Sequence, residues 1–147
     1  MITRKDDGVR LSPDEARARF AAARVARLAT VRPDGSPHLV PITFVVAGDM
    51  VFSAVDAKPK RTVELQRLTN ISANREVCLL ADEYADDWTQ LWWARADGTA
   101  RIVDDERAQQ LLAAKYPQYV SEPPPGPVLA MDVARWSGWA ASDPLPG

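Results

Sequence analysis

The sequence predicts a small α+β protein, mainly β with short helices, in which about six antiparallel strands form a single β-barrel. Two observations predict this class. Short apolar runs rich in β-branched residues are interrupted by turn signals about every ten residues, and helical periodicity appears only in short segments. The chain also shows no strand–helix alternation of the doubly wound kind, no internal repeat and no phosphate-binding P-loop.

The first predicted element is a helix that follows a loose leader at residues 1–10. Ser12 has the side chain of an N-cap, and Pro13 suits the first helical position. Glu15 completes a capping box with Ser12. The helix is therefore expected to begin at this point and to end near Arg24.

Three strands are expected to follow as a meander. The turn-forming stretches "RPDGSP" and "AGD" separate them. Pro41 lacks a backbone N–H donor, so the middle strand should lie at a sheet edge or a bulge, where something other than a strand can approach. The predicted strands are residues 25–31, 38–46 and 50–55.

The second half of the chain predicts strands interrupted by two helices. The first helix should place Leu65, Leu68 and Thr69 on one side. Asp97-Gly98 is a strong signal for a two-residue hairpin turn. The predicted elements are a helix at 62–70, a strand at 76–82, hairpin strands at 88–96 and 99–103, a helix from Asp104 or Asp105 to about Tyr116, and a strand at 128–141, with a fraying tail at 142–147.

Size and composition limit the possible functions. The 147 residues suffice for one domain, expected to span 1–147, and the net charge of −2 argues against a general binder of nucleic acids or anionic membranes. No stretch reaches membrane-spanning length. Cys78 is the only cysteine and His38 the only histidine, so neither an internal disulfide nor a Cys/His metal cluster is expected. A cytoplasmic location is expected.

A cluster of basic residues precedes the predicted helix at 62–70. Lys58, Lys60 and Arg61 lie within four positions, and Thr62 follows. Free N–H groups at a helix start, two or three cations and a hydroxyl would form a compact anion site. Cations at this place oppose the helix dipole, which a bound anion would offset. The alternative is a solvated helix start whose cations face only water.

Tryptophan is abundant, with five residues in this short chain. Trp92 and Trp93 are consecutive in a predicted strand, so their side chains should face opposite ways. Indole rings are enriched at interfaces and are unfavourable in open water. One interpretation assigns all five to core or dimer packing, and the other places one or two against a flat aromatic ligand.

The order and spacing of these elements resemble the pyridoxamine 5'-phosphate oxidase-like FMN-binding split-barrel superfamily. Within it, the chain is most similar to the actinobacterial branch that uses the deazaflavin coenzyme F-420. The resemblance covers roughly residues 24–105 and a late closing strand. It rests on "RVARLATVRPDGSPHLVPITFVV", "MVFSAVDAKPKRTVELQRLTNISANREVCLLAD", "WWARADGTARIVDD" and "RWSGW".

The resemblance implies a six-stranded split barrel that forms a homodimer with the cofactor in a groove between the subunits. It assigns the cofactor phosphate to Lys60 and Arg61, with Thr62 beside them. Pro59 departs from the polar or basic residue that relatives often carry, and Lys58 could compensate. The implied lining of the groove is His38, Val40, Pro41, Thr43, Ser53 and Val55, with Trp92 or Trp93 approaching from the partner subunit.

The resemblance also implies an oxidoreductase that transfers hydride between coenzyme F-420 and a small organic substrate. In such a protein the cofactor carries the chemistry, so no side chain is assigned a catalytic role. The phosphate and acidic oligoglutamate tail of F-420 suit a local basic patch on a mildly acidic protein. FMN carries only the phosphate. The alternatives are therefore an FMN-dependent oxidase of the pyridoxamine-phosphate type and a non-catalytic flavin- or tetrapyrrole-binding protein.

Overall fold

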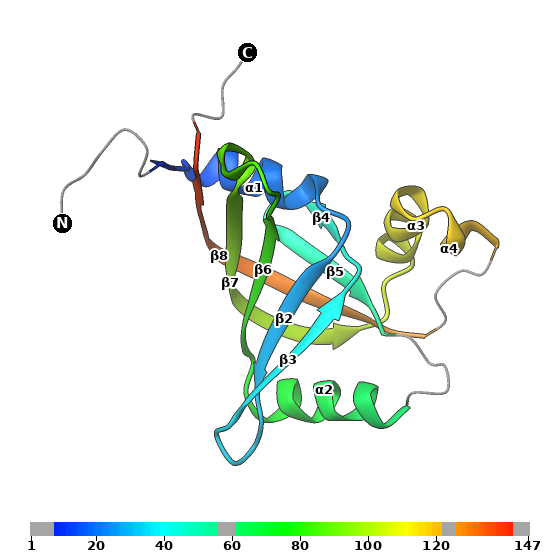
Figure 1. Cartoon of the computed structure of the whole chain (residues 1–147). Coiled ribbons are helices and arrows are strands. Elements are labelled where there is room, and N and C mark those ends of the chain that lie inside the picture. Colours follow the sequence, from blue (N-terminus) through cyan, green and yellow to red (C-terminus); the bar gives the residue numbers. More distant parts are fainter. Residues whose placement is uncertain (1–7, 56–60, 122–125, 143–147) are drawn as a thin grey trace.

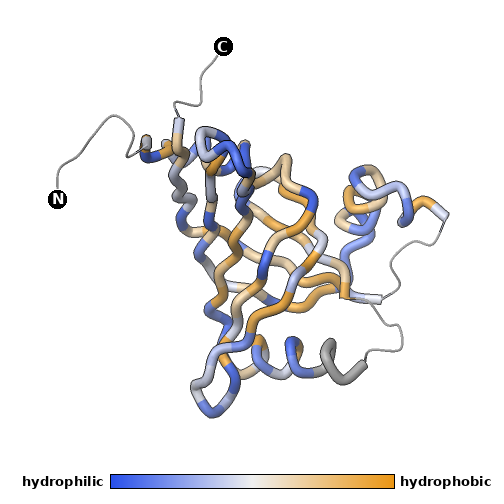
Figure 2. The backbone as a smooth tube through the Cα atoms, viewed as in Figure 1, coloured by the Kyte–Doolittle hydropathy of each residue, from blue (hydrophilic) through white to orange (hydrophobic). Residues whose placement is uncertain are grey.

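An eight-stranded antiparallel sheet forms most of the protein and curls into a barrel, with helices at both ends (Figure 1). The computed structural model describes residues 8–55, 61–121 and 126–142, with the backbone alone for residues 61–65. The mainly β class is confirmed, whereas the sheet has eight strands instead of the expected six. Figure 2 shows apolar residues along the strands and hydrophilic residues at the turn between the second and third strands.

The sequence of elements alternates short helices with runs of strands. The strands are β1 (Val9–Arg10), β2 (Ala26–Val31), β3 (Pro37–Ile42), β4 (Val45–Ala47), β5 (Met50–Ala54), β6 (Glu76–Glu83), β7 (Trp92–Val103) and β8 (Val128–Ala140). The helices are α1 (Pro13–Ala22), α2 (Arg61–Ala73), the 3₁₀ helix η2 (Trp88–Gln90), α3 (Glu106–Lys115) and α4 (Gln118–Ser121).

The sheet follows the order β3-β2-β6-β7-β8-β5-β4, and β1 pairs with β8. Its two edge strands, β3 and β4, are consecutive in the chain and separated only by Thr43 and Phe44. The predicted strand at 38–46 is therefore two strands, because the chain passes there from one edge of the sheet to the other. Two edges joined by so short a link must lie close together, which closes the barrel and leaves a split between them.

The side chain of Tyr116, at the end of α3, lies in this split. Its hydroxyl accepts the N–H of Phe44 at 3.0 Å and lies within donating distance of the carbonyls of Phe44, at 3.0 Å, and Arg24, at 2.9 Å. Tyr116 is only 3% exposed. Buried backbone groups need hydrogen-bond partners. The phenol hydroxyl therefore supplies hydrogen bonds that a neighbouring strand would supply if the edge were paired.

Removal of the Tyr116 hydroxyl should therefore destabilise the barrel. We expect Tyr116→Phe to lower the free energy of unfolding by about 2 kcal/mol, because the buried Phe44 N–H loses its partner. Urea unfolding followed by circular dichroism measures this change. Tyr119→Phe is the control, since among the described residues that hydroxyl bonds only the side chain of Thr43, at 3.0 Å in a half-buried position. Equal losses for the two variants would contradict the role given to Tyr116.

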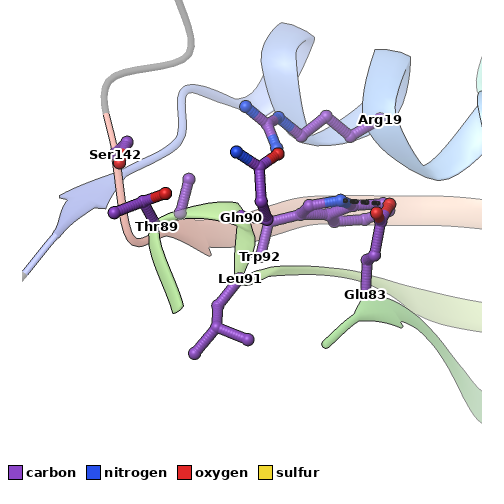
Figure 3. Close-up of a pocket in the computed structure, with 8 residues that line it drawn as sticks. Arg19, Glu83, Thr89, Gln90, Leu91, Trp92 and Ser142 are labelled. Carbon is purple, nitrogen blue, oxygen red and sulfur yellow. Dashed lines mark hydrogen bonds between the residues drawn. The ribbon is translucent and has the colours of Figure 1, made fainter. Parts of the chain in front are cut away.

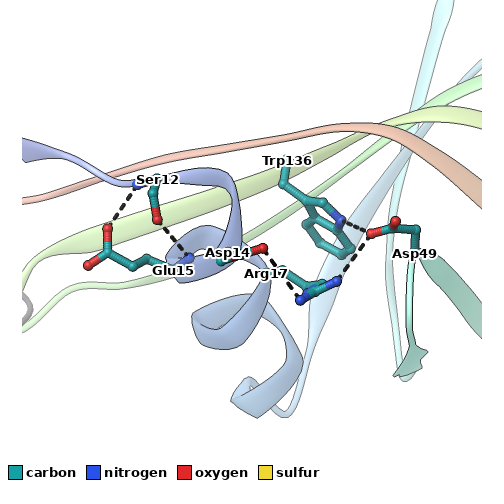
Figure 4. Close-up of polar contacts among 6 residues, drawn as sticks. All are labelled: Ser12, Asp14, Glu15, Arg17, Asp49 and Trp136. Atoms are coloured by element: carbon teal, nitrogen blue, oxygen red, sulfur yellow. Dashed lines mark hydrogen bonds and ion pairs between the residues drawn. The ribbon is translucent and has the colours of Figure 1, made fainter.

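Helix α1 covers one end of the barrel. The predicted capping box is confirmed: the Ser12 hydroxyl accepts the Glu15 N–H, and the Glu15 carboxylate accepts the Ser12 N–H (Figure 4). Phe20 inserts between the rings of Phe44 and Trp136, at centroid distances of 4.7 and 5.4 Å. The core therefore joins a helix near the start of the chain to its last strand.

Exposed polar contacts also join α1 to the turn between β4 and β5. Arg17 pairs with Asp14 on its own helix and with Asp49 in the turn between β4 and β5 (Figure 4). The same Asp49 oxygen accepts the indole N–H of Trp136 at 3.1 Å. Exposed ion pairs stabilise little, so these contacts orient the helix more than they hold it in place.

The predicted hairpin at Asp97-Gly98 is wrong, because β7 continues through it from Trp92 to Val103. The strand carries only an irregularity in its register with β8 at these two residues. A Cβ added at Gly98 would overlap the backbone carbonyl of Asp132. This glycine therefore serves the close approach of β8 and not a turn.

The ends of two other predicted segments also differ from expectation. Residues 88–90 form η2, and the strand begins only at Trp92. Val9 and Arg10, expected in a loose leader, pair with Ala140 and Trp139 of β8.

Candidate functional site

Strand β3 carries four of the predicted lining residues on or just after it. It lies at an edge of the sheet, which confirms the expectation drawn from Pro41. Burial alternates along the strand, so His38 and Val40 share the face of the buried Ile42, whereas Pro41 lies exposed on the opposite face. Val40 and Pro41 therefore face opposite sides of the same strand. Their contact with a cofactor stays a prediction.

A polar group from α2 packs under this end of β2 and β3. Asn70 is fully buried, and its amide donates to the Thr30 hydroxyl at 2.9 Å. Gln66 donates to the Asn70 side-chain oxygen at 2.7 Å. Arg67, on the same helix, is only 5% exposed. His38 is the cross-strand partner of Thr30, so this polar group lies next to the predicted groove.

The surroundings of His38 are positively charged. Partial burial, followed by the charges of Arg32 and Arg67, lowers the pKa of His38 below its ordinary value. Its Nδ1 atom is inaccessible to solvent and has no hydrogen-bond partner among the described residues. Charges that disfavour an imidazolium favour an anion, and an orphaned ring nitrogen suits a polar ligand group. The residues present at this edge therefore fit a phosphorylated ring compound.

The predicted phosphate-binding residues flank the start of α2. The helix begins at Arg61, so Arg61 and Thr62 occupy its first positions, where free backbone N–H groups attract anions. The side chains of these two residues, and all of Lys58 and Lys60, lie outside the described residues. Arg67, further along the same helix, carries positive charge toward His38.

The spacing of apolar residues alone does not predict the burial of Arg67. The expected row of Leu65, Leu68 and Thr69 is wrong at Thr69, which is exposed. The buried row is Arg67, Asn70 and Ile71. These three residues have the helical spacing i, i+3, i+4, which predicts a shared helix face when polar residues are counted together with apolar ones.

Thr43 lies where the two edges of the sheet meet, and Ser53 and Val55 lie on or just after the neighbouring strand β5. The buried Ser53 hydroxyl donates to the Thr43 carbonyl at 2.7 Å, and the Thr43 hydroxyl lies 3.0 Å from that of Tyr119. The N–H of Val55 donates to the Pro127 carbonyl at 3.3 Å. These polar atoms already form hydrogen bonds within the protein, so a ligand would have to contact other atoms of these residues. Their part in the groove stays a prediction.

Trp92 and Trp93 point to opposite faces of β7. Trp92 lies beside α1, and its indole N–H donates to Glu83 at 3.2 Å. Trp93 lies on the outer face, opposite Trp139 of β8 and 5.5 Å from the guanidinium of Arg95.

A hollow of about 430 Å³ surrounds Trp93 and Trp139 on the outer face of β7 and β8. Arg10, Arg95 and Arg135 also line it, and the buried Ser137 hydroxyl beside them has no partner among the described residues. Aromatic rings with several guanidinium groups suit a flat, negatively charged compound. No sequence signal beyond the density of tryptophan pointed to this face.

Other chemistries have little support in the described part of the chain. No group of three or more His, Cys, Asp or Glu residues there could hold a metal ion. Burial raises the pKa of the Cys78 thiol, which disfavours the nucleophilic thiolate. Among the same residues, no helix is long and apolar enough to cross a membrane.

The comparison with known families identifies the family of the chain. The model of the pyridoxamine 5'-phosphate oxidase family matches residues 12–140, nearly the whole chain. The chain belongs to this family. No curated protein matches the chain.

Solved structures agree with the split-barrel fold of the pyridoxamine 5'-phosphate oxidase family. An FAD-binding protein from Mesorhizobium loti is 22% identical, with a TM-score of 0.66 and coverage of 91% of this chain and 98% of that one. An FAD-binding protein from Mycobacterium smegmatis is 23% identical, with a TM-score of 0.61 and coverage of 88% and 94%. A heme-binding protein from Mycobacterium smegmatis is 17% identical, with a TM-score of 0.69 and coverage of 93% and 57%.

Proposed function

We propose that this oxidase-family protein is a coenzyme F-420-dependent oxidoreductase that transfers hydride between the cofactor and a small organic substrate. The observation that carries the proposal lies at His38 on the edge strand, where partial burial and then the positive charges of Arg32 and Arg67 lower the pKa, in a protein with a net charge of −2. F-420 bears an acidic tail in addition to its phosphate. It therefore benefits from more cationic surface than a phosphate alone would use.

The residues of this chain would bind and orient the cofactor. Lys60 and Arg61, with Thr62 and Lys58, would hold its phosphate at the start of α2. His38, through its unpaired ring nitrogen, would hydrogen-bond a polar atom of the ligand. A bound deazaflavin supplies a hydride donor and acceptor that avoids one-electron steps. The protein would thus contribute position and exclusion of water, and it needs no side-chain nucleophile.

Paired binding titrations test the proposal. F-420 and FMN are each added to the purified protein, and the fluorescence of its tryptophans is followed. We expect a colourless protein whose fluorescence is quenched by F-420 more strongly than by FMN. Reduced F-420 should then lose its spectrum when a quinone, a biliverdin-like tetrapyrrole or an unsaturated lactone is added. Binding of neither cofactor, or binding of F-420 without turnover of any substrate, would contradict the proposal.

The second candidate is an FMN-dependent oxidase of the pyridoxamine-phosphate type. The names of two structural neighbours, both FAD-binding proteins, favour an ordinary flavin. FMN carries the same phosphate, so the same basic residues would serve it. A protein that is purified yellow with tightly held flavin would favour this candidate. Tight binding of a tetrapyrrole without turnover would instead favour a non-catalytic binding protein, as the heme-binding neighbour suggests.

The partner we propose is a second copy of this chain, bound against the outer face of β3, β2 and β6. Leu39, Ala29 and Cys78 form one cross-strand row on this face. Leu39 is 66% exposed, and Leu80 of β6 is also exposed. A contiguous apolar patch of this kind is typical of interaction sites, and a two-fold axis would let it pair with itself.

Charge placed on this patch should prevent association. We expect wild type to sediment as a dimer and Leu39→Lys to sediment as a monomer, because each copy would bury a lysine against its partner. Val120→Lys, another exposed apolar residue, on α4, is the control and should leave the dimer intact. A monomeric wild type, or a dimeric Leu39→Lys protein, would exclude this surface.

A further inference from the structure

Two hollows flank the indole of Trp92 at the end of the barrel that α1 covers. The larger has a volume of about 480 Å³ and the smaller, drawn in Figure 3, about 270 Å³. Arg19, Glu83 and Trp92 line both. Helix α2, with the proposed cofactor site, lies at the other end of the barrel (Figure 1). The hollows are thus separate from that site within one chain.

Two opposite charges flank this indole without neutralising each other. The guanidinium of Arg19 lies 5.6 Å from the centre of the Trp92 ring, and no carboxylate in the described part of the chain lies within 4.0 Å of it. Within the described ranges of the chain, Glu83 accepts only the neutral indole N–H, at 3.2 Å.

The charged residues around this pair already have partners. Glu15, one turn before Arg19 on α1, is held by Ser12 in the capping box. Arg27 pairs with Asp82 at 3.1 Å. Arg24 donates to the carbonyl of Lys115 at 2.9 Å and lies over the ring of Tyr116. Of the charged residues that line the larger hollow in the described part of the chain, Arg19 and Glu83 are therefore the two with neither an ion pair nor a hydrogen bond to the backbone.

The larger hollow also has an apolar wall. Ala22, Ala23 and Val25 line it beside the Trp92 ring, and Val25 is 42% exposed. A guanidinium suits a carboxylate, and a carboxylate suits an ammonium group. An apolar wall next to both suits a short hydrocarbon side chain, and the volume lies within the range of small-ligand sites.

We propose that this hollow binds a free α-amino acid with an apolar side chain. Arg19 binds the carboxylate, Glu83 binds the ammonium group, and the side chain lies against Trp92 and Ala23. Either charge alone on the ligand would leave one protein charge uncompensated. The site therefore selects a zwitterion over a simple acid or a simple amine.

Calorimetric titrations of the full chain test this proposal with three probes of equal side chain. L-leucine carries both charges, 4-methylpentanoate lacks the ammonium group, and 3-methylbutylamine lacks the carboxylate. We expect L-leucine to bind at least about tenfold more tightly than either analogue, because each charge-assisted bond contributes to affinity. Absence of L-leucine binding, or equal binding of an analogue, would overturn the proposal.

Variants locate the site. Arg19→Gln and Glu83→Gln should each weaken L-leucine binding about tenfold. Arg17→Gln is the matched control, because Arg17 lies on the same helix but pairs with Asp14 and Asp49. Unchanged affinity in Arg19→Gln would refute the proposal.

A competition experiment separates this site from the cofactor site. We expect F-420 and FMN to leave L-leucine binding unchanged. Competition would place Trp92 in the cofactor groove and overturn the inference. If Arg19→Gln still binds the cofactor but no longer binds L-leucine, the two sites are independent and both are supported. If the wild type binds the cofactor but not L-leucine, the amino-acid site is excluded and the proposed function is unaffected.

Discussion

Replacement of both Lys60 and Arg61 by alanine is expected to weaken cofactor binding by about 3 kcal/mol or more, at least a hundredfold in affinity. Charge-assisted hydrogen bonds to an anion contribute roughly 1.5–3 kcal/mol each, and 1.4 kcal/mol corresponds to about a factor of ten. Both residues flank the start of α2, where the backbone N–H groups also favour an anion. The loss should be similar for F-420 and FMN, because both carry the phosphate.

Fluorescence titration of wild type and the double variant at several salt concentrations measures this effect. The variant should also lose part of the salt dependence of binding, since fewer cations attract the phosphate. Arg107→Ala is the control, because Arg107 is exposed on α3 and its replacement removes one of the two positive charges that the double variant loses, from a different helix. Equal affinities in wild type and the double variant would remove these residues from the site.

Gly98→Ala should destabilise the barrel by about 3 kcal/mol, at the upper end of the usual cost of overpacking. The added methyl group would overlap the Asp132 carbonyl, which is backbone and cannot rotate away. The strands must separate locally, and Gly98 lies in the middle of the long β7–β8 pairing. Thermal and urea unfolding should both show the loss.

Gly48→Ala is the matched control for this prediction. Gly48 has a left-handed φ of +61°, but a Cβ there meets nothing within 4 Å. Its cost should be limited to backbone strain of about 1 kcal/mol. If Gly98→Ala and Gly48→Ala lower the free energy of unfolding equally, the close approach of β7 and β8 is not the reason that position 98 requires glycine.

Local signals predicted the starts of two helices well. Ser12 and Glu15 form the expected capping box. Asp105 accepts the N–H of Ala108, so the third predicted helix begins where the sequence indicated. The turn after β2 uses its predicted residues, with Ser36 bonded to Asp34. These features depend on side chains within three residues of one another, which the sequence alone displays.

The features that failed depend on distant partners. The residues next to Gly98 in the sequence do not show whether this glycine forms a hairpin turn or allows the close approach of Asp132. The division of residues 38–46 follows from two sheet edges that meet in space. Arg67 is buried on the face of α2 that packs against β2. The sequence alone indicates the basic residues before α2, whose role stays a prediction. It does not indicate Arg19 and Glu83 as a pair, since 64 positions separate them in the chain.

The position of β8 has a consequence for synthesis in the cell. This strand pairs with β1, β5 and β7, although it is the last of the eight described strands to be translated. Until residue 140 has left the ribosome, β5 and β7 lack their common neighbour and Phe20 lacks its contact with Trp136. The nascent chain must therefore wait with open strand edges, which expose it to chaperones and to aggregation.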